Sequence, residues 1–196
     1  MKQIKQSLKG VNVDELERTF DKCLVWFYAF PRTKIGLTDL ANFIMSSKTA
    51  TKQVIESLVE IQFLNREIIG KAWLLSANQK HFYFTIKKIP YNLGLVYESG
   101  ILEAVHKTVE SARAIILFGS YRWGTDVEES DIDIAVEVIG NQDLQIVHLG
   151  VIEQLGYRKK VSVNLHIFSR NKIDLNLFAN IANGIVLDGF LEARVV

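Results

Sequence analysis

The chain has 196 residues, an apolar fraction of 48% and a formal net charge of +1. This length allows one large or two small domains, and the apolar fraction is sufficient for hydrophobic cores. No apolar run approaches the ~18 residues of a membrane span, and the first residues lack the apolar segment of a signal peptide. The single cysteine, Cys23, excludes an intramolecular disulfide and a cysteine-rich zinc site. We therefore expect a cytoplasmic protein with no membrane partner.

The two halves of the chain differ in charge. Residues 1–90 contain 14 Lys and Arg against 8 Asp and Glu, whereas residues 91–196 contain 9 against 14. A basic half suits a polyanion or an acidic partner, and an acidic half suits a metal site.

Apolar residues at helical spacing predict three helices in the basic half. The first covers about residues 13–30, the second about 37–44, and the third about 51–63. Two strand-like segments follow, at 72–75 and 81–86, and a polar turn joins them into a predicted β-hairpin.

Three helices followed by a hairpin resemble a winged helix-turn-helix, the DNA-binding unit of many small prokaryotic regulators. The third helix would then be the recognition helix. The residues expected to meet DNA are Lys48, Thr49, Thr51, Lys52 and Gln53 near its start, and Asn78 and Lys80 at the tip of the wing. Glu56 and Glu60 repel phosphate, and this helix contains no arginine, the best guanine reader. A winged helix used only for protein contacts or dimerisation is therefore the alternative.

A further helical pattern runs from Asn92 to Ser111. Its apolar residues recur four apart, and Gly94 and Gly100 weaken its first part. We interpret this helix as a connector between two domains or as the first helix of the second one. Its apolar stripe suits a homodimer seam equally well.

The most informative segment is a glycine-serine pair followed, ten residues later, by two aspartates. Gly119 and Ser120 end an apolar strand-like run, and Asp131 and Asp133 begin the next one. Residues two apart in a strand share a face, so the two carboxylates would lie about 6.5 Å apart at their Cα atoms. A divalent cation such as Mg²⁺ relieves their repulsion, because it takes carboxylate oxygens together with substrate phosphates. Gly119 allows a tight turn against a ligand, and the Ser120 hydroxyl adds a donor.

This segment resembles the nucleotidyltransferase superfamily that includes DNA polymerase β, and within it the minimal nucleotidyltransferases. Their signature is Gly-Ser, ten residues, Asp-x-Asp, which Gly119, Ser120, Asp131 and Asp133 match; Tyr121-Arg122-Trp123-Gly124 and Ser130 also resemble the family's loop. The resemblance implies transfer of a nucleoside monophosphate from a nucleoside triphosphate to a hydroxyl, with Asp131 and Asp133 as catalytic Mg²⁺ ligands. It implies that Gly119, Ser120 and Ser130 contact the nucleotide. Arg122 either steadies the triphosphate or is an exposed loop residue.

The family adds a third acidic residue on a later strand, and here the match is imperfect. A predicted helix at 143–155 precedes a predicted strand at 160–168, and Asn164 falls at the position of the third carboxylate. An amide cannot accept a proton, so loss of a general base there lowers the rate by about 10²–10⁴-fold. His166, two residues on, either substitutes as the base or is a partly buried strand histidine. Asp174 is expected to cap a last helix.

The sequence therefore predicts an α+β protein. Residues 1–90 form a winged helix-turn-helix domain, 91–111 a connecting helix, and 112–196 a polymerase-β-like domain with a mixed sheet flanked by helices. The expected function is Mg²⁺-dependent nucleotidyl transfer, through a one- or two-ion site and with ATP as the expected nucleotide, to a protein or other acceptor. By resemblance, the partner is a helical HEPN-type ribonuclease that the transferase silences. The alternative is a DNA-binding transcriptional regulator whose transferase domain is catalytically impaired.

Overall fold

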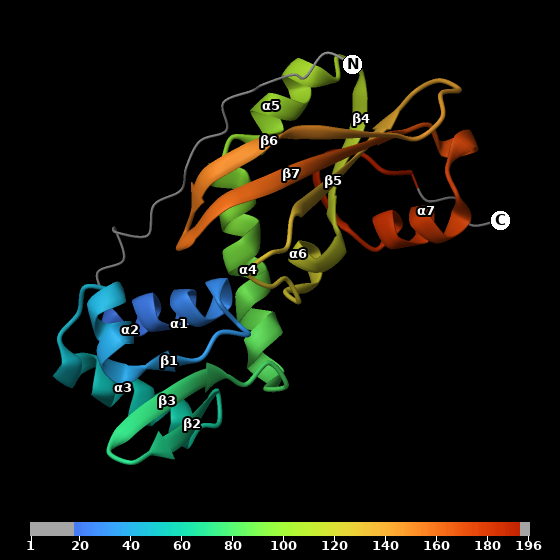
Figure 1. Ribbon diagram of the computed structural model, residues 1–196. Coiled ribbons are helices and arrows are strands. Elements are labelled where there is room, and N and C mark those ends of the chain that lie inside the picture. The colour runs from blue at the N-terminus through green and yellow to red at the C-terminus, as the bar shows by residue number, and fades with distance from the viewer. Residues whose placement is uncertain (1–17, 193–196) are drawn as a thin grey trace.

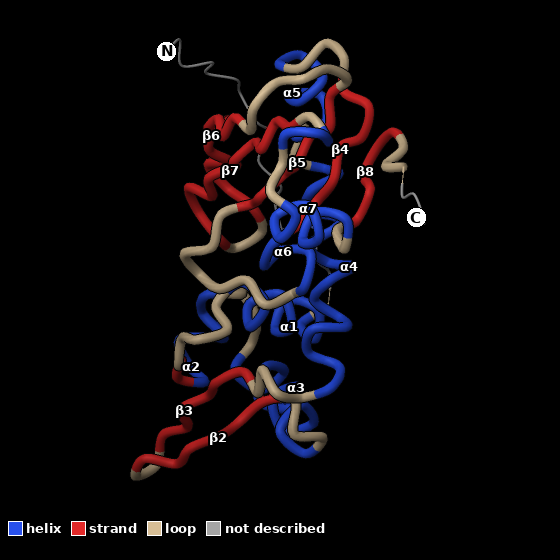
Figure 2. The backbone as a smooth tube through the Cα atoms, turned by 90° about the vertical axis from the view of Figure 1, so that its right-hand side faces the viewer, coloured by secondary structure: helices blue, strands red, loops and turns tan. Residues whose placement is uncertain are grey.

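The structure is a computed structural model that describes residues 18–192. It has two parts, one above the other, and the long helix α4 (Phe82–Glu98) runs from one into the other (Figures 1 and 2). Among residues 18–192, none of the helices combines the length and the apolar character that crossing a bilayer requires.

The N-terminal part packs three helices against a small antiparallel sheet. Its elements are α1 (Thr19–Ala29), β1 (Ile35–Gly36), α2 (Leu37–Phe43), α3 (Lys48–Glu60), β2 (Leu64–Ile69) and β3 (Ala72–Ala77), with strand order β1-β3-β2. Ser47 caps α3 by accepting from the backbone of Ala50 at 3.1 Å. The core includes Phe27, Leu40, Ile55 and Leu75, all buried.

Helices are present where the three were predicted, although residues 13–17 of the first prediction lie outside the described residues. The predicted hairpin is wrong. The strands that pair are β2 and β3, and residues 82–86 begin α4. His81 caps this helix by accepting at Nδ1 from the backbone of Tyr83. The helical period of α4 was hidden because two of its buried residues, Lys88 and Asn92, are polar.

The tip of the hairpin therefore lies at other residues than predicted. Ile69 pairs with Ala72, so Gly70, with φ +62°, and Lys71 make the turn. Asn78 and Lys80, predicted for the tip, follow β3 instead. The Asn78 side chain donates to the Gln62 carbonyl at 2.8 Å, which joins the end of β3 to the end of α3.

Helix α4 belongs to two hydrophobic cores. Phe84 packs in the N-terminal core, whereas Leu95 and Val96 pack in the core of the second part. The helix predicted to start at Asn92 thus begins ten residues earlier, at Phe82. It is broken at Gly100, which adopts φ +78° and starts α5 (Ile101–Thr108).

The second part is built on a five-stranded mixed sheet. Its elements are β4 (Ala112–Phe118), α6 (Gly119–Trp123), β5 (Ile132–Val138), β6 (Gln145–Leu155), β7 (Arg158–Phe168), the 3₁₀ turn η1 (Arg170–Lys172), α7 (Leu175–Ala182) and β8 (Ile185–Gly189). The strand order is β6-β7-β5-β4-β8, and only β5 and β7 run parallel among these neighbours. Helices α4 and α5 cover one face, and α7 covers the other.

The helix predicted at 143–155 is wrong, because these residues form β6. A β-bulge between His148 and Gly150 inserts one extra residue against β7. The bulge interrupts the alternation at Leu149, and the buried residues of β6 are Leu149, Ile152 and Leu155. A spacing of three in a strand imitates one face of a helix.

Candidate functional site

The two halves of the glycine-serine and aspartate motif meet at one end of the sheet. Strands β4 and β5 are antiparallel, and Phe118 lies directly opposite Asp133. Gly119 follows with φ +71°, and a Cβ on it would lie 2.9 Å from Asp133 Oδ2. Glycine is therefore required here for its backbone conformation and for space. Ser120, half-buried, comes next at the start of α6.

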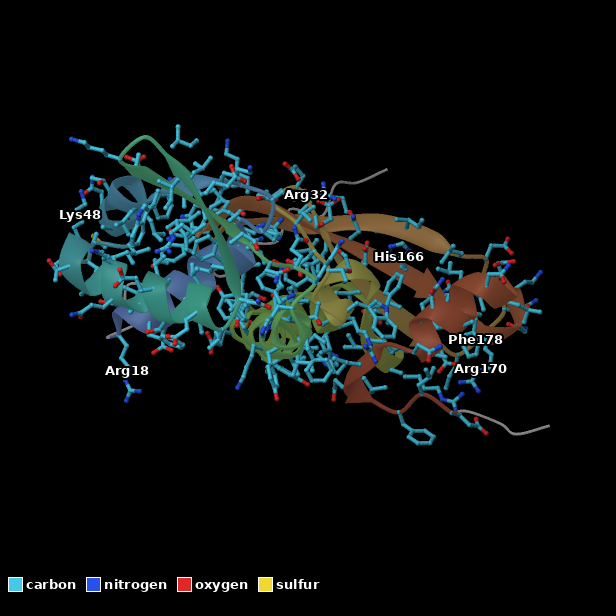
Figure 3. The ribbon with its side chains drawn as sticks, turned by 90° about the horizontal axis from the view of Figure 1, so that it is seen from below. Arg18, Arg32, Lys48, His166, Arg170 and Phe178 are labelled. Carbon is cyan, nitrogen blue, oxygen red and sulfur yellow. The ribbon has the colours of Figure 1, made fainter. Side chains whose placement is uncertain are left out.

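Strand β7 brings two more predicted residues to the aspartates. It runs parallel to β5 with Asn164 opposite Asp133. Asn164 Nδ2 donates to Asp131 Oδ2 at 3.2 Å, and His166 Nε2 lies 3.3 Å from Asp133 Oδ1. In Figure 3, His166 lies over the sheet of the second part, far from Lys48 at the other end of the molecule.

The loop between Ser120 and Asp131 is anchored by a buried ionic network that sequence reasoning missed. Asp126 is 3% exposed, and its Oδ2 lies 3.1 Å from Lys88 Nζ. Its other oxygen accepts from Asn92 Nδ2 at 2.7 Å. Burial lowers the pKa of Lys88 and raises the pKa of Asp126, and their mutual attraction opposes both shifts. The available signal was a pair of polar residues, Lys88 and Asn92, four apart on a face of α4 that is otherwise apolar where it is buried.

Arg158, at the start of β7, completes this network. Its Nε donates to the Glu128 carbonyl at 3.1 Å and its Nη1 to the Tyr121 hydroxyl at 2.9 Å. Its Nη2 donates to the carbonyl of Ser130, the residue directly before Asp131. The guanidinium thus joins α6, the loop and the first metal-ligand candidate.

The remaining predicted nucleotide contacts have local partners. Ser130 Oγ accepts from the backbone of Val127 at 2.9 Å and closes a turn of the loop. The Arg122 guanidinium carbon lies 3.6 Å from the centre of the Trp123 ring, and its Nε is buried without a hydrogen-bond partner. Ser130 therefore stabilises a turn within the loop, and Arg122 stacks on Trp123 close to Gly119 and Ser120.

Among the described residues, no group of three or more His, Cys, Asp and Glu side chains is arranged to hold a metal ion. The donor set at the site is Asp131 and Asp133, with Asn164 where the third carboxylate was expected. Mg²⁺ is commonly bound by one or two carboxylates together with substrate phosphates. These residues therefore fit an ion shared with a nucleotide, and they do not fit an all-protein metal cage.

The comparison with family models agrees with this geometry. Residues 101–188 match the family described as Polymerase beta, Nucleotidyltransferase. This match supports a domain of the nucleotidyltransferase superfamily in this segment of the chain. A search of curated proteins found no match. The matched span of the nucleotidyltransferase domain starts at α5 and contains all of the site residues from Gly119 to His166, whereas the N-terminal part and α4 lie outside it.

Proposed function

We propose that this protein transfers a nucleoside monophosphate from a nucleoside triphosphate, with ATP as the expected nucleotide, to a hydroxyl of a protein acceptor. The observation that carries the proposal is the approach of Gly119 to Asp133 within the matched domain. It joins the phosphate-binding turn to the carboxylate pair.

The residues have separate roles in this proposal. Asp131 and Asp133 hold Mg²⁺ together with the triphosphate, and the ion neutralises charge on the phosphates. The backbone at Gly119 and the Ser120 hydroxyl bind phosphate oxygens. The network around Asp126 and Arg158 keeps the intervening loop, and with it Asp131, in place.

The experiment is transfer of label from ATP, in the presence of Mg²⁺ and cell extract, to a protein acceptor. We expect the variants Asp131→Asn and Asp133→Asn to lower labelling by about 100-fold or more, because the phosphates lose their electrostatic partner. Asp143→Asn is the matched control, since its side chain is 90% exposed and lies outside the site. Labelling that persists in both site variants would remove the support for this function.

The acceptor follows from the family resemblance. Minimal nucleotidyltransferases are often paired with helical HEPN-type ribonucleases, and we propose a protein of this type as acceptor. Mass spectrometry of the labelled band identifies the acceptor and the modified side chain. Label found solely on nucleic acid or on a small molecule contradicts a protein acceptor.

A second candidate is a DNA-binding regulator with an impaired transferase domain. Its support is a surface pocket of about 420 Å³ on the N-terminal part, where Lys48 and Lys52 of α3 face Lys71 at the wing tip and Trp73 of β3. Thr51 is fully buried, so its side chain does not contribute to this surface. Thr49 and Gln53 are exposed on α3, and Lys80 lies away from the wing tip.

Gel-shift titrations with duplex DNA test this candidate. Replacing Lys48, Lys52 and Lys71 by alanine should weaken binding and flatten its salt dependence, because each lysine neutralises a phosphate. Lys107→Ala on α5 is the control, since this exposed lysine lies on the other part. Tight sequence-specific binding, with no transfer by the natural chain or by Asn164→Asp, favours the regulator. Recovery of transfer in Asn164→Asp favours an impaired enzyme.

A further inference from the structure

Strand β7 presents two side-chain nitrogens, and no carboxylate, to the aspartate pair. Asn164 Nδ2 donates a hydrogen bond to Asp131 Oδ2, and His166 Nε2 lies within hydrogen-bonding distance of Asp133 Oδ1. Each aspartate is thus contacted through one oxygen from the same strand. A carboxylate keeps further lone pairs after accepting one hydrogen bond, so each can still bind an ion.

The surroundings of the His166 ring decide which nitrogen carries its proton. Its Nδ1 is buried and has no hydrogen-bond partner. A proton on Nδ1 would be a buried donor without an acceptor, which is costly. A neutral ring therefore carries its hydrogen on Nε2 and donates it to Asp133 Oδ1. A general base acting through Nε2 would need the opposite tautomer.

The packing holds this donor in one orientation. The His166 side chain is 13% exposed, and the Phe118 ring meets it edge to face at 5.0 Å between centres. Phe118 is also the residue opposite Asp133 on β4. The Asp133 carboxylate is consequently held through Oδ1 by His166, while Oδ2 lies in the space that a Cβ on Gly119 would need.

We propose that His166 is a positioning residue that orients Asp133 for a divalent ion. Asn164 does the same for Asp131. Asn164 occupies the place of the third carboxylate and His166 adds a second N–H donor, so the site holds one ion with the nucleotide and not two. This inference rests on the proposed metal–nucleotide site and deepens it.

Electron paramagnetic resonance of free Mn²⁺ measures ion binding directly, with a non-hydrolysable ATP analogue present. We expect one Mn²⁺ per chain, and an affinity about 10–100-fold weaker in His166→Ala. His166→Gln keeps an N–H donor of similar reach and should recover most of this affinity. His106→Ala is the control, because His106 makes a comparable exposed contact with Asp188 at 2.8 Å outside the site.

The outcomes separate the inference from the proposed function. Unchanged Mn²⁺ affinity in His166→Ala, failure of the glutamine variant to recover affinity, or two ions per chain overturns the inference. If His166→Ala lowers only the transfer rate, the histidine acts as a base. Mn²⁺ binding that depends on His166, in a chain that transfers no label, keeps the inference and removes the transferase activity.

Discussion

At the scale of single residues, Gly119 carries the strictest requirement of the site. Its backbone has a φ of +71°, and the Asp133 carboxylate lies next to the position that a Cβ on residue 119 would take. The same carboxylate is held from the other side by His166. One added methyl group thus acts on the ion ligand directly, and the effect is larger than backbone strain alone.

For Gly119→Ala we expect at least a tenfold loss of Mn²⁺ and nucleotide affinity, because the new Cβ would lie 2.9 Å from Asp133 Oδ2. The left-handed conformation adds about 1–2 kcal/mol of destabilisation. Gly70→Ala is the matched control: Gly70 has φ +62°, and a Cβ added to it would meet nothing within 4 Å. Calorimetric titration measures the affinity for Mn²⁺ and nucleotide, and urea unfolding measures the free energy of unfolding. Equal affinity loss in the two variants would argue that strain alone matters.

At the scale of elements, the loop from Gly124 to Ser130 is defined by side chains of α4 and β7. Lys88 Nζ donates to the Asp126 carbonyl at 2.6 Å, and Arg158 Nη1 lies 3.8 Å from the Asp126 carboxylate. Two cations thus surround one buried anion. A buried charge that loses its partner is much more costly than an exposed pair that is broken.

Asp126→Asn tests this network. We expect a loss of about 3–5 kcal/mol in the free energy of unfolding, because Lys88 is left buried without an anionic partner. Glu56→Gln, which breaks the exposed pair with Lys52, should change this free energy by less than about 0.5 kcal/mol. Urea unfolding followed by circular dichroism gives both values. A loss below about 1 kcal/mol for Asp126→Asn would contradict the assigned role.

At the scale of the whole molecule, the Glu128 carboxylate joins the loop from Gly124 to Ser130 to the N-terminal part. Glu128 Oε1 accepts from the backbone of Arg32 at 3.0 Å, from the backbone of Thr33 at 2.9 Å and from the Thr33 hydroxyl at 2.8 Å. Partial burial raises the pKa of Glu128, but these hydrogen bonds outweigh it and the pKa is lowered overall. The contact ties the two parts together close to the site.

This contact should weaken in acid. Because the pKa of Glu128 in the folded protein lies below its unfolded value, its stabilising effect is present above the unfolded value and is lost as the pH falls through the folded one. Wild-type stability should therefore fall more steeply than that of Glu128→Gln when the pH drops from about 5 to 3. Thermal unfolding at several pH values in this range measures the fall in stability. Glu129→Gln is the control, because Glu129 is an exposed neighbour of Glu128. Parallel curves for all three proteins would rule the contact out as a pH-sensitive link.

The sequence by itself predicted which residues meet at the candidate site. Gly119, Ser120, Asp131 and Asp133 were predicted from spacing, because a glycine turn and alternating carboxylates are local properties of strand ends. The three N-terminal helices were predicted from the period of their apolar residues, and the strand around Asn164 was predicted with the help of the family resemblance. These features depend on neighbours in the chain.

Only the tertiary structure decided what surrounds that site. The bulge at His148 made β6 imitate a helix, and the buried polar pair Lys88 and Asn92 concealed the start of α4. The contacts of Asn164 and His166 with the two aspartates, and the contact of Glu128 with Thr33, join residues more than 30 positions apart. Such contacts depend on strand register and on which charges are buried together, and no local pattern encodes either.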